Sequence, residues 1–63
     1  MRIVSCTRAE ADRKLMGLCA GWMHFDRPDR AREVMTALEA LRKGAGEVTA
    51  MHTIYRIQEA QAS

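Results

Sequence analysis

The stretch EVTAMHTIYRIQ, residues 47–58, decides the fold class of this 63-residue chain. Its β-branched and aromatic residues favour a strand. Its apolar residues also recur at helical spacing, as at Val48, Met51 and Ile54, and the following QEAQA favours a helix. Alternation by two leaves no clean polar side. We therefore expect a third helix over residues 47–61 and an all-α fold, a helical hairpin with a C-terminal helix.

The alternative is an α+β fold of the order β-α-α-β. In this fold residues 47–58 form a strand that pairs antiparallel with residues 2–6, where Ile3 and Val4 favour β-structure. The sequence contains no repeat, low-complexity segment or linker. Either fold is therefore a single domain that spans residues 1–63.

The start of a first helix is marked by Thr7 and Glu10, which have the spacing of a capping box. Apolar residues then recur at steps of three and four, as from Leu15 to Leu18 and Trp22. Together these signals predict a helix over residues 8–23.

A second helix is predicted over residues 28–43. Asp26 can cap it, Pro28 suits its first turn, and Asp29 favours its positive end. The helix should end before Gly44. The two helices form the hairpin that both fold alternatives share.

The small size of the chain predicts association. A domain of this length buries only about 60% of its unfolded surface and is marginally stable alone. We therefore expect a homodimer in which two hairpins form a helical bundle. The residues expected in the core or dimer interface are Leu15, Leu18, Val34, Leu38 and Leu41.

The residue types that bind metals or carry out catalysis are few and poorly spaced. The two cysteines and two histidines form neither a Cys-x-x-Cys nor a closely spaced His pair, so we expect no metal site and no cofactor. No third group orients a Cys–His pair, and so short a chain offers little pocket volume. We therefore expect no enzymatic activity.

The apolar runs and cysteines also indicate a compartment. The longest apolar run, residues 15–23, is too short to span a bilayer. Two cysteines without a signal peptide are typical of reduced thiols, so we expect a cytoplasmic protein that does not insert into a membrane.

The segment GLCAGWMHF, residues 17–25, holds the only tryptophan and the only phenylalanine. Large aromatic side chains dominate interface energetics, and methionines add adaptable apolar surface. We expect a small protein-interaction module that inhibits or modulates a larger bacterial protein, by analogy of size and composition with small phage-encoded antagonists. The residues expected to bind the partner are Trp22, Met23, Phe25, Arg27, Asp29 and Arg30.

The alternative function is a small nucleic-acid-binding transcriptional regulator. Its phosphate contacts would come from Arg8, Arg13, Lys14, Arg27, Arg30 and Arg32. The formal charge of only +2, from ten basic and eight acidic residues, disfavours this alternative.

Overall fold

Residues 47–58 form two strands and a tight turn, so the prediction of a third helix and of an all-α fold is wrong. The computed structural model describes residues 1–58, and residues 59–61 of the expected helix lie outside this range. In chain order the elements are β1 (Arg2–Cys6), α1 (Arg8–His24), α2 (Pro28–Arg42), β2 (Glu47–Ala50) and β3 (Thr53–Ile57). The fold is therefore α+β.

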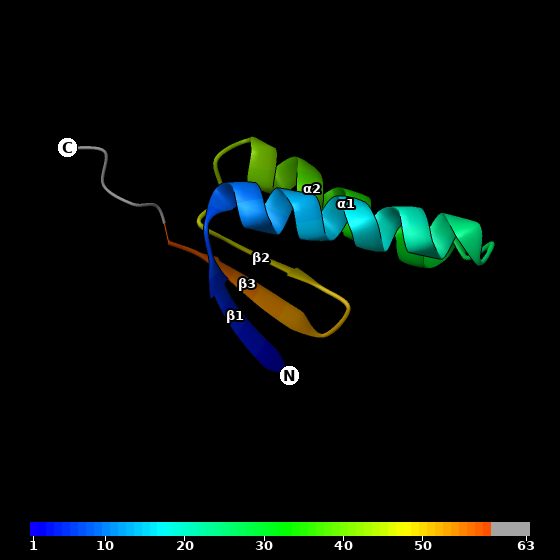
Figure 1. The fold of residues 1–63 in the computed structure, drawn as a ribbon, viewed down its shortest axis with the longest axis horizontal. Helices are drawn as coiled ribbons and strands as arrows, with labels where there is room; N and C mark the ends of the chain where they lie inside the picture. The colour runs from blue at the N-terminus through cyan, green and yellow to red at the C-terminus, as the bar shows by residue number, and fades with distance from the viewer. Residues whose placement is uncertain (59–63) are drawn as a thin grey trace.

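The three strands form one mixed sheet in the order β1-β3-β2. The α+β alternative fits this class, but its pairing differs from the observed one. β1 pairs in parallel with β3, and β2 pairs antiparallel with β3. Figure 1 shows α1 and α2 together on one side of the sheet.

The turn between β2 and β3 explains why polar and apolar residues do not alternate regularly over residues 47–58. Met51 and His52 both have positive φ, 51° and 60°, as a two-residue type I′ hairpin turn requires. A two-residue turn switches the inward face from even to odd positions, because Val48 pairs with Tyr55 and both are buried. Read as one strand, the stretch therefore shows no polar side.

Both predicted helices form. The capping box is present, since the Thr7 hydroxyl accepts from the Glu10 N–H and the Glu10 carboxylate accepts from the Thr7 N–H. Pro28 occupies the first turn of α2, as predicted. The expected cap by Asp26 is wrong, because the N-cap of α2 is Arg27 and its side chain makes no capping hydrogen bond.

The C-terminus of α2 is closed by Gly44, which has φ +107°. The Gly44 N–H donates to the Leu41 carbonyl at 3.1 Å, and the Ala45 N–H donates to the Ala40 carbonyl at 3.0 Å. This is a Schellman motif, in which glycine takes the left-handed position. The predicted helix stop is thereby confirmed.

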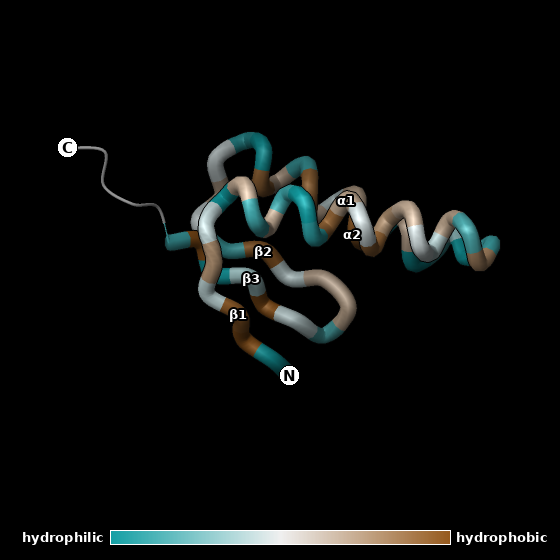
Figure 2. The backbone as a smooth tube through the Cα atoms, viewed as in Figure 1, coloured by the Kyte–Doolittle hydropathy of each residue, from teal (hydrophilic) through white to brown (hydrophobic). Residues whose placement is uncertain are grey.

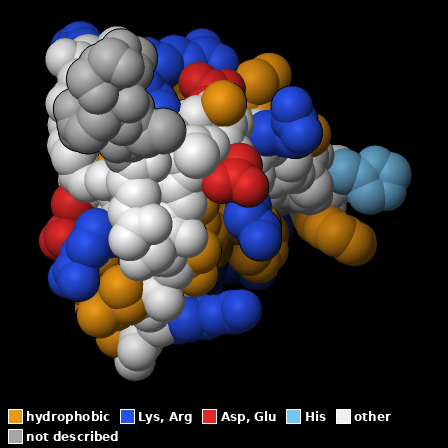
Figure 3. Space-filling model, turned by 60° about the vertical axis from the view of Figure 1, so that its left-hand side comes forward, with side chains coloured by type: hydrophobic (Ala, Val, Ile, Leu, Met, Phe, Trp, Pro, Cys, Tyr) orange, Lys and Arg blue, Asp and Glu red, His pale blue; other side chains and the backbone are white. Residues whose placement is uncertain are grey.

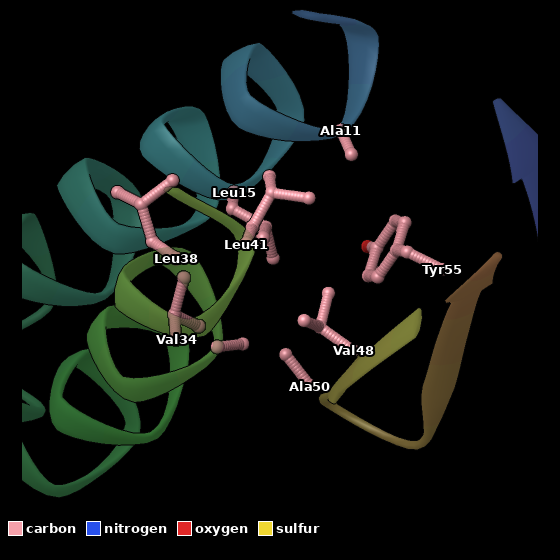
Figure 4. Packing of buried hydrophobic residues seen from close by; sticks show 9 residues of the cluster. Ala11, Leu15, Val34, Leu38, Leu41, Val48, Ala50 and Tyr55 are labelled. Atoms are coloured by element: carbon pink, nitrogen blue, oxygen red, sulfur yellow. The ribbon is translucent and has the colours of Figure 1, made fainter. Parts of the chain in front are cut away.

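The core lies between the helical hairpin and the covered face of the sheet. Figure 4 shows Leu15 and Ala11 from α1 pointing toward Val48, Ala50 and Tyr55 from the strands, with side chains of α2 between them. The buried members from α2 include Val34, Leu38 and Leu41. Because these side chains lie near the sheet, the hairpin is fixed mainly at its sheet-proximal half.

Two polar contacts tie the helices to the rest of the fold. The Arg8 guanidinium donates to the Ala45 carbonyl at 3.0 Å and also to the Leu41 carbonyl, where α2 ends. The Glu33 carboxylate accepts from the Met51 N–H at 3.0 Å. One end of α2 is thus held by α1, and α2 in turn anchors the β2–β3 turn.

The distal part of the hairpin extends past the edge of the sheet (Figure 1). Figure 2 shows that apolar stretches, in brown, continue into this part of both helices and alternate with polar ones. Apolar side chains beyond the sheet have less of the core to pack against. This end of the molecule therefore carries the candidate site.

Candidate functional site

The hairpin tip, residues 22–30, joins the end of α1 to the start of α2. Asp26 has φ +58°, a conformation that glycine adopts most easily. Its N–H donates to the Met23 carbonyl at 3.1 Å, and the Arg27 N–H donates to the Trp22 carbonyl at 2.9 Å. These bonds form a second Schellman motif, with Asp26 in place of the usual glycine. The chain therefore reverses sharply and presents the residues around Asp26 outward.

The tip exposes two large apolar side chains. Phe25 is 71% exposed and Met23 is 61% exposed. The His24 and Phe25 rings lie edge to face, with centroids 5.4 Å apart. Figure 3 shows hydrophobic and histidine side chains projecting from this end of the molecule. An exposed aromatic ring of this kind suits insertion into a pocket on a partner.

Charged side chains surround the aromatic residues. The Arg30 guanidinium lies over the Trp22 ring, 5.8 Å from the ring centroid, within the range of a cation–π contact. Asp29 lies between two arginines, with its carboxylate 3.5 Å from Arg27 Nε and 3.9 Å from Arg30 Nε. The hydrogen bond from Arg27 lowers the pKa of Asp29, so this carboxylate is charged at neutral pH.

The structure brings together all six residues that the sequence suggested for partner binding. Trp22 is half-buried against the core, whereas Met23, Phe25, Arg27 and Asp29 are exposed. Arg30 joins this group through its contact with Trp22. The tip thus combines an aromatic residue anchored in the fold with a second one that is free to meet a partner.

The residues expected in the core or dimer interface lie within the single chain. Leu15, Val34, Leu38 and Leu41 are buried, and Leu18 is half-buried beside them. They pack α1 and α2 against each other and against the sheet. Leu15, Val34 and Leu41 are fully buried, whereas Leu38, which is 5% exposed, also lines a depression between the two helices.

The sequence alone did not show which methionines line the same surface. Met16, Met23 and Met35 line two adjoining depressions between α1 and α2, with Cys19 shared by both. We call this surface the methionine groove; its residues are Met16, Cys19, Ala20, Met23, Met35 and Leu38. Met51 is separate, because it lies in the β2–β3 turn. In the sequence, Met16, Ala20 and Met23 recur at steps of four and three, which places them on one side of α1.

The cysteines and histidines make no metal site in the part of the chain that the structure describes. No three His, Cys, Asp or Glu side chains within residues 1–58 lie close enough to hold an ion. Cys6 and Cys19 are free, half-buried thiols. Cys19 Sγ lies 3.9 Å from the Ala31 carbonyl oxygen, which places it between the two helices.

Neither helix within residues 1–58 has the length and apolar character of a membrane span. The arrangement at the tip has the chemistry of a binding surface: exposed apolar groups, a fixed turn and flanking charges. No protein-family model, curated protein or solved structure matches this chain, so the tip and the methionine groove are interpreted from their own geometry.

Proposed function

We propose that this protein is a small interaction module that docks onto a larger protein through its hairpin tip. The observation that carries the proposal is the exposure of Phe25 and Met23 at the end of a hairpin whose other end is fixed by the core. Hot spots in protein interfaces are enriched in aromatic residues and arginine, surrounded by groups that exclude water. Trp22, Arg27 and Arg30 supply such a surrounding here.

The chemistry of the tip defines the partner. Phe25 requires an apolar pocket on the partner, while Asp29 and its two arginines require a polar rim. The partner is a folded bacterial protein that is larger than this chain, and occupation of its pocket inhibits or modulates it. We place the complex in the cytoplasm, where the thiols of Cys6 and Cys19 stay reduced.

Nucleic-acid binding is the weaker alternative on the same structure, because several of its cations already face protein groups. The Arg8 guanidinium donates to carbonyls at the end of α2, and Arg27 and Arg30 flank Asp29. The hydrogen bonds with Thr7 lower the pKa of the Glu10 carboxyl group most, and the nearby charges of Arg13 and Lys14 lower it further. Phosphate binding needs cations that are free to neutralise a backbone.

The test is a capture experiment from lysate of the source cell with three forms of the tagged protein. The first is the wild type, the second carries Phe25→Thr, and the third carries Ile3→Thr. Ile3 is a matched control, because it is 55% exposed but lies in β1, away from the tip. Each capture is run with and without nuclease, and bound proteins are identified by mass spectrometry.

We expect one stoichiometric protein with the wild type and with Ile3→Thr, in the presence of nuclease. Phe25→Thr should reduce its capture about tenfold or more, since loss of an aromatic hot spot costs about 2 kcal/mol or more of binding free energy. Equal capture by all three forms would place the docking surface elsewhere. Loss of all capture on nuclease treatment would favour the nucleic-acid alternative.

A further inference from the structure

Within residues 1–58, no other element covers the apolar surface on the face of the hairpin that points away from the sheet. Met16, Met23 and Met35 are 52%, 61% and 44% exposed and line the methionine groove. A further depression beside Arg8 and Arg13 continues the hollow along α1 past Met16. The helix faces that carry Leu15 and Val34 contact the core instead. The groove therefore lies on a second, separate face.

On this face of α2 a cation and an anion flank Met35. Arg32 lies three residues before Met35, and Glu39 lies four residues after it, so all three share one side of the helix. Neither the Arg32 side chain nor the Glu39 side chain makes an ion pair or hydrogen bond within the described residues. Arg32 and Glu39 carry opposite charges and lie seven residues apart on the same side of α2.

From this pattern we infer that the occupant of the groove is a second copy of this chain, stacked antiparallel across a two-fold axis near Met35. In an antiparallel helix pair centred between residues 35 and 36, Arg32 of each copy faces Glu39 of the other. Met35 of each copy then lies at the centre. A two-fold interface requires this self-complementarity, in which residue i meets j and j meets i.

The surface of α1 at the same level fits such a neighbour. Cys19 and Met35 both line the two depressions of the groove, so the middle of α1 lies beside Met35. There Ala20, a small exposed residue that lines one of the depressions, leaves room for close approach.

The test measures the association of purified protein by sedimentation over a wide concentration range. The variants are Arg32→Glu, Glu39→Arg and their equimolar mixture. Each single variant should weaken dimerisation about tenfold, because like charges then face each other at two symmetric contacts. In the mixture, positions 32 and 39 of unlike chains carry opposite charges at both contacts. A heterodimer should therefore form with nearly the wild-type dissociation constant.

A second variant tests the close approach without relying on charge. Ala20→Gln should leave the chain folded, because Ala20 is exposed and glutamine is a good helix former. The same change should abolish the dimer by blocking the α1 contact. Circular dichroism spectra that match the wild type would verify the fold of each variant.

Three results would overturn the inference: a wild type that stays monomeric at millimolar concentration, a dimer that neither charge reversal weakens, or a mixture that fails to associate. A groove that a larger protein occupies would give the first of these results. The outcome does not depend on Phe25, so the tip proposal and the dimer can fail separately.

Discussion

Asp12 and Arg42 show how single residues fix the hairpin. Arg42 Nε donates to Asp12 Oδ2 at 2.8 Å, and Arg42 Nη2 donates to Asp12 Oδ1 at 3.1 Å, so the pair is bidentate. It joins the sheet-proximal ends of α1 and α2, opposite the tip. The hydrogen bonds from Arg42 lower the pKa of Asp12 below its ordinary value of 3.8.

This shift predicts a pH dependence of stability. The pKa of Asp12 is lower in the folded protein than in the unfolded chain. The pair therefore stabilises the fold fully at pH values above the unfolded-state pKa. This stabilisation is lost as pH falls through the folded-state pKa. Asp12→Asn should therefore lower the melting temperature at pH 7 and lower it less at pH 2, where protonation of Asp12 weakens the pair. In an Arg42→Met background the same substitution should have little effect at either pH. Equal destabilisation by Asp12→Asn at both values would contradict this account of the pair.

At the level of elements, the two helices were predictable because their signals are local. The capping box at Thr7, Pro28 at a first turn and Gly44 at a helix end each act within a few residues. The hairpin of β2 and β3 was not predictable, since Met51 and His52 lack the Asn-Gly chemistry typical of its turn. The parallel pairing of β1 with β3 depends on contacts made only in the folded chain.

The turn between β2 and β3 holds His52 in a left-handed conformation. His52 sits with φ +60° at the second central position of the turn, where glycine is preferred. His52→Gly should raise the free energy of unfolding by about 0.5–1 kcal/mol. Glycine relieves the left-handed strain of the folded state, and this gain exceeds the cost of the greater conformational entropy that glycine gives the unfolded chain. Gly44→Ala should act in the opposite direction, because alanine is strained at φ +107°. Denaturant titration of both variants checks the signs, and a destabilising His52→Gly would contradict this view of the turn.

At the scale of the whole molecule, the fold separates two surfaces of one hairpin. The methionine groove lies along the helices, and Phe25 lies at their tip. Antiparallel stacking about Met35 would leave the two tips at opposite ends of a dimer. Such a dimer could engage two partner sites at once, which raises avidity where the spacing matches.

The composition of the tip was predictable from sequence, because Trp22, Phe25 and the charges around Pro28 are close neighbours along the chain. The groove was only partly predictable. Met35 comes from a different helix than Met16 and Met23, and its place beside Cys19 follows from the antiparallel packing of α1 and α2. A role for Arg32 and Glu39 in a dimer could be inferred only after the structure showed that no other described element covers this face.

Site-specific photo-crosslinking in the source cell tests whether the hairpin tip binds a protein. A benzophenone amino acid replaces Phe25 in one strain and Ile3 in another, and adducts are compared after irradiation. If the tip binds a protein, we expect one discrete protein adduct from position 25, unaffected by nuclease and absent from position 3. An adduct from position 3 alone, or a nuclease-sensitive adduct from position 25, would contradict the claim that the hairpin tip binds a protein.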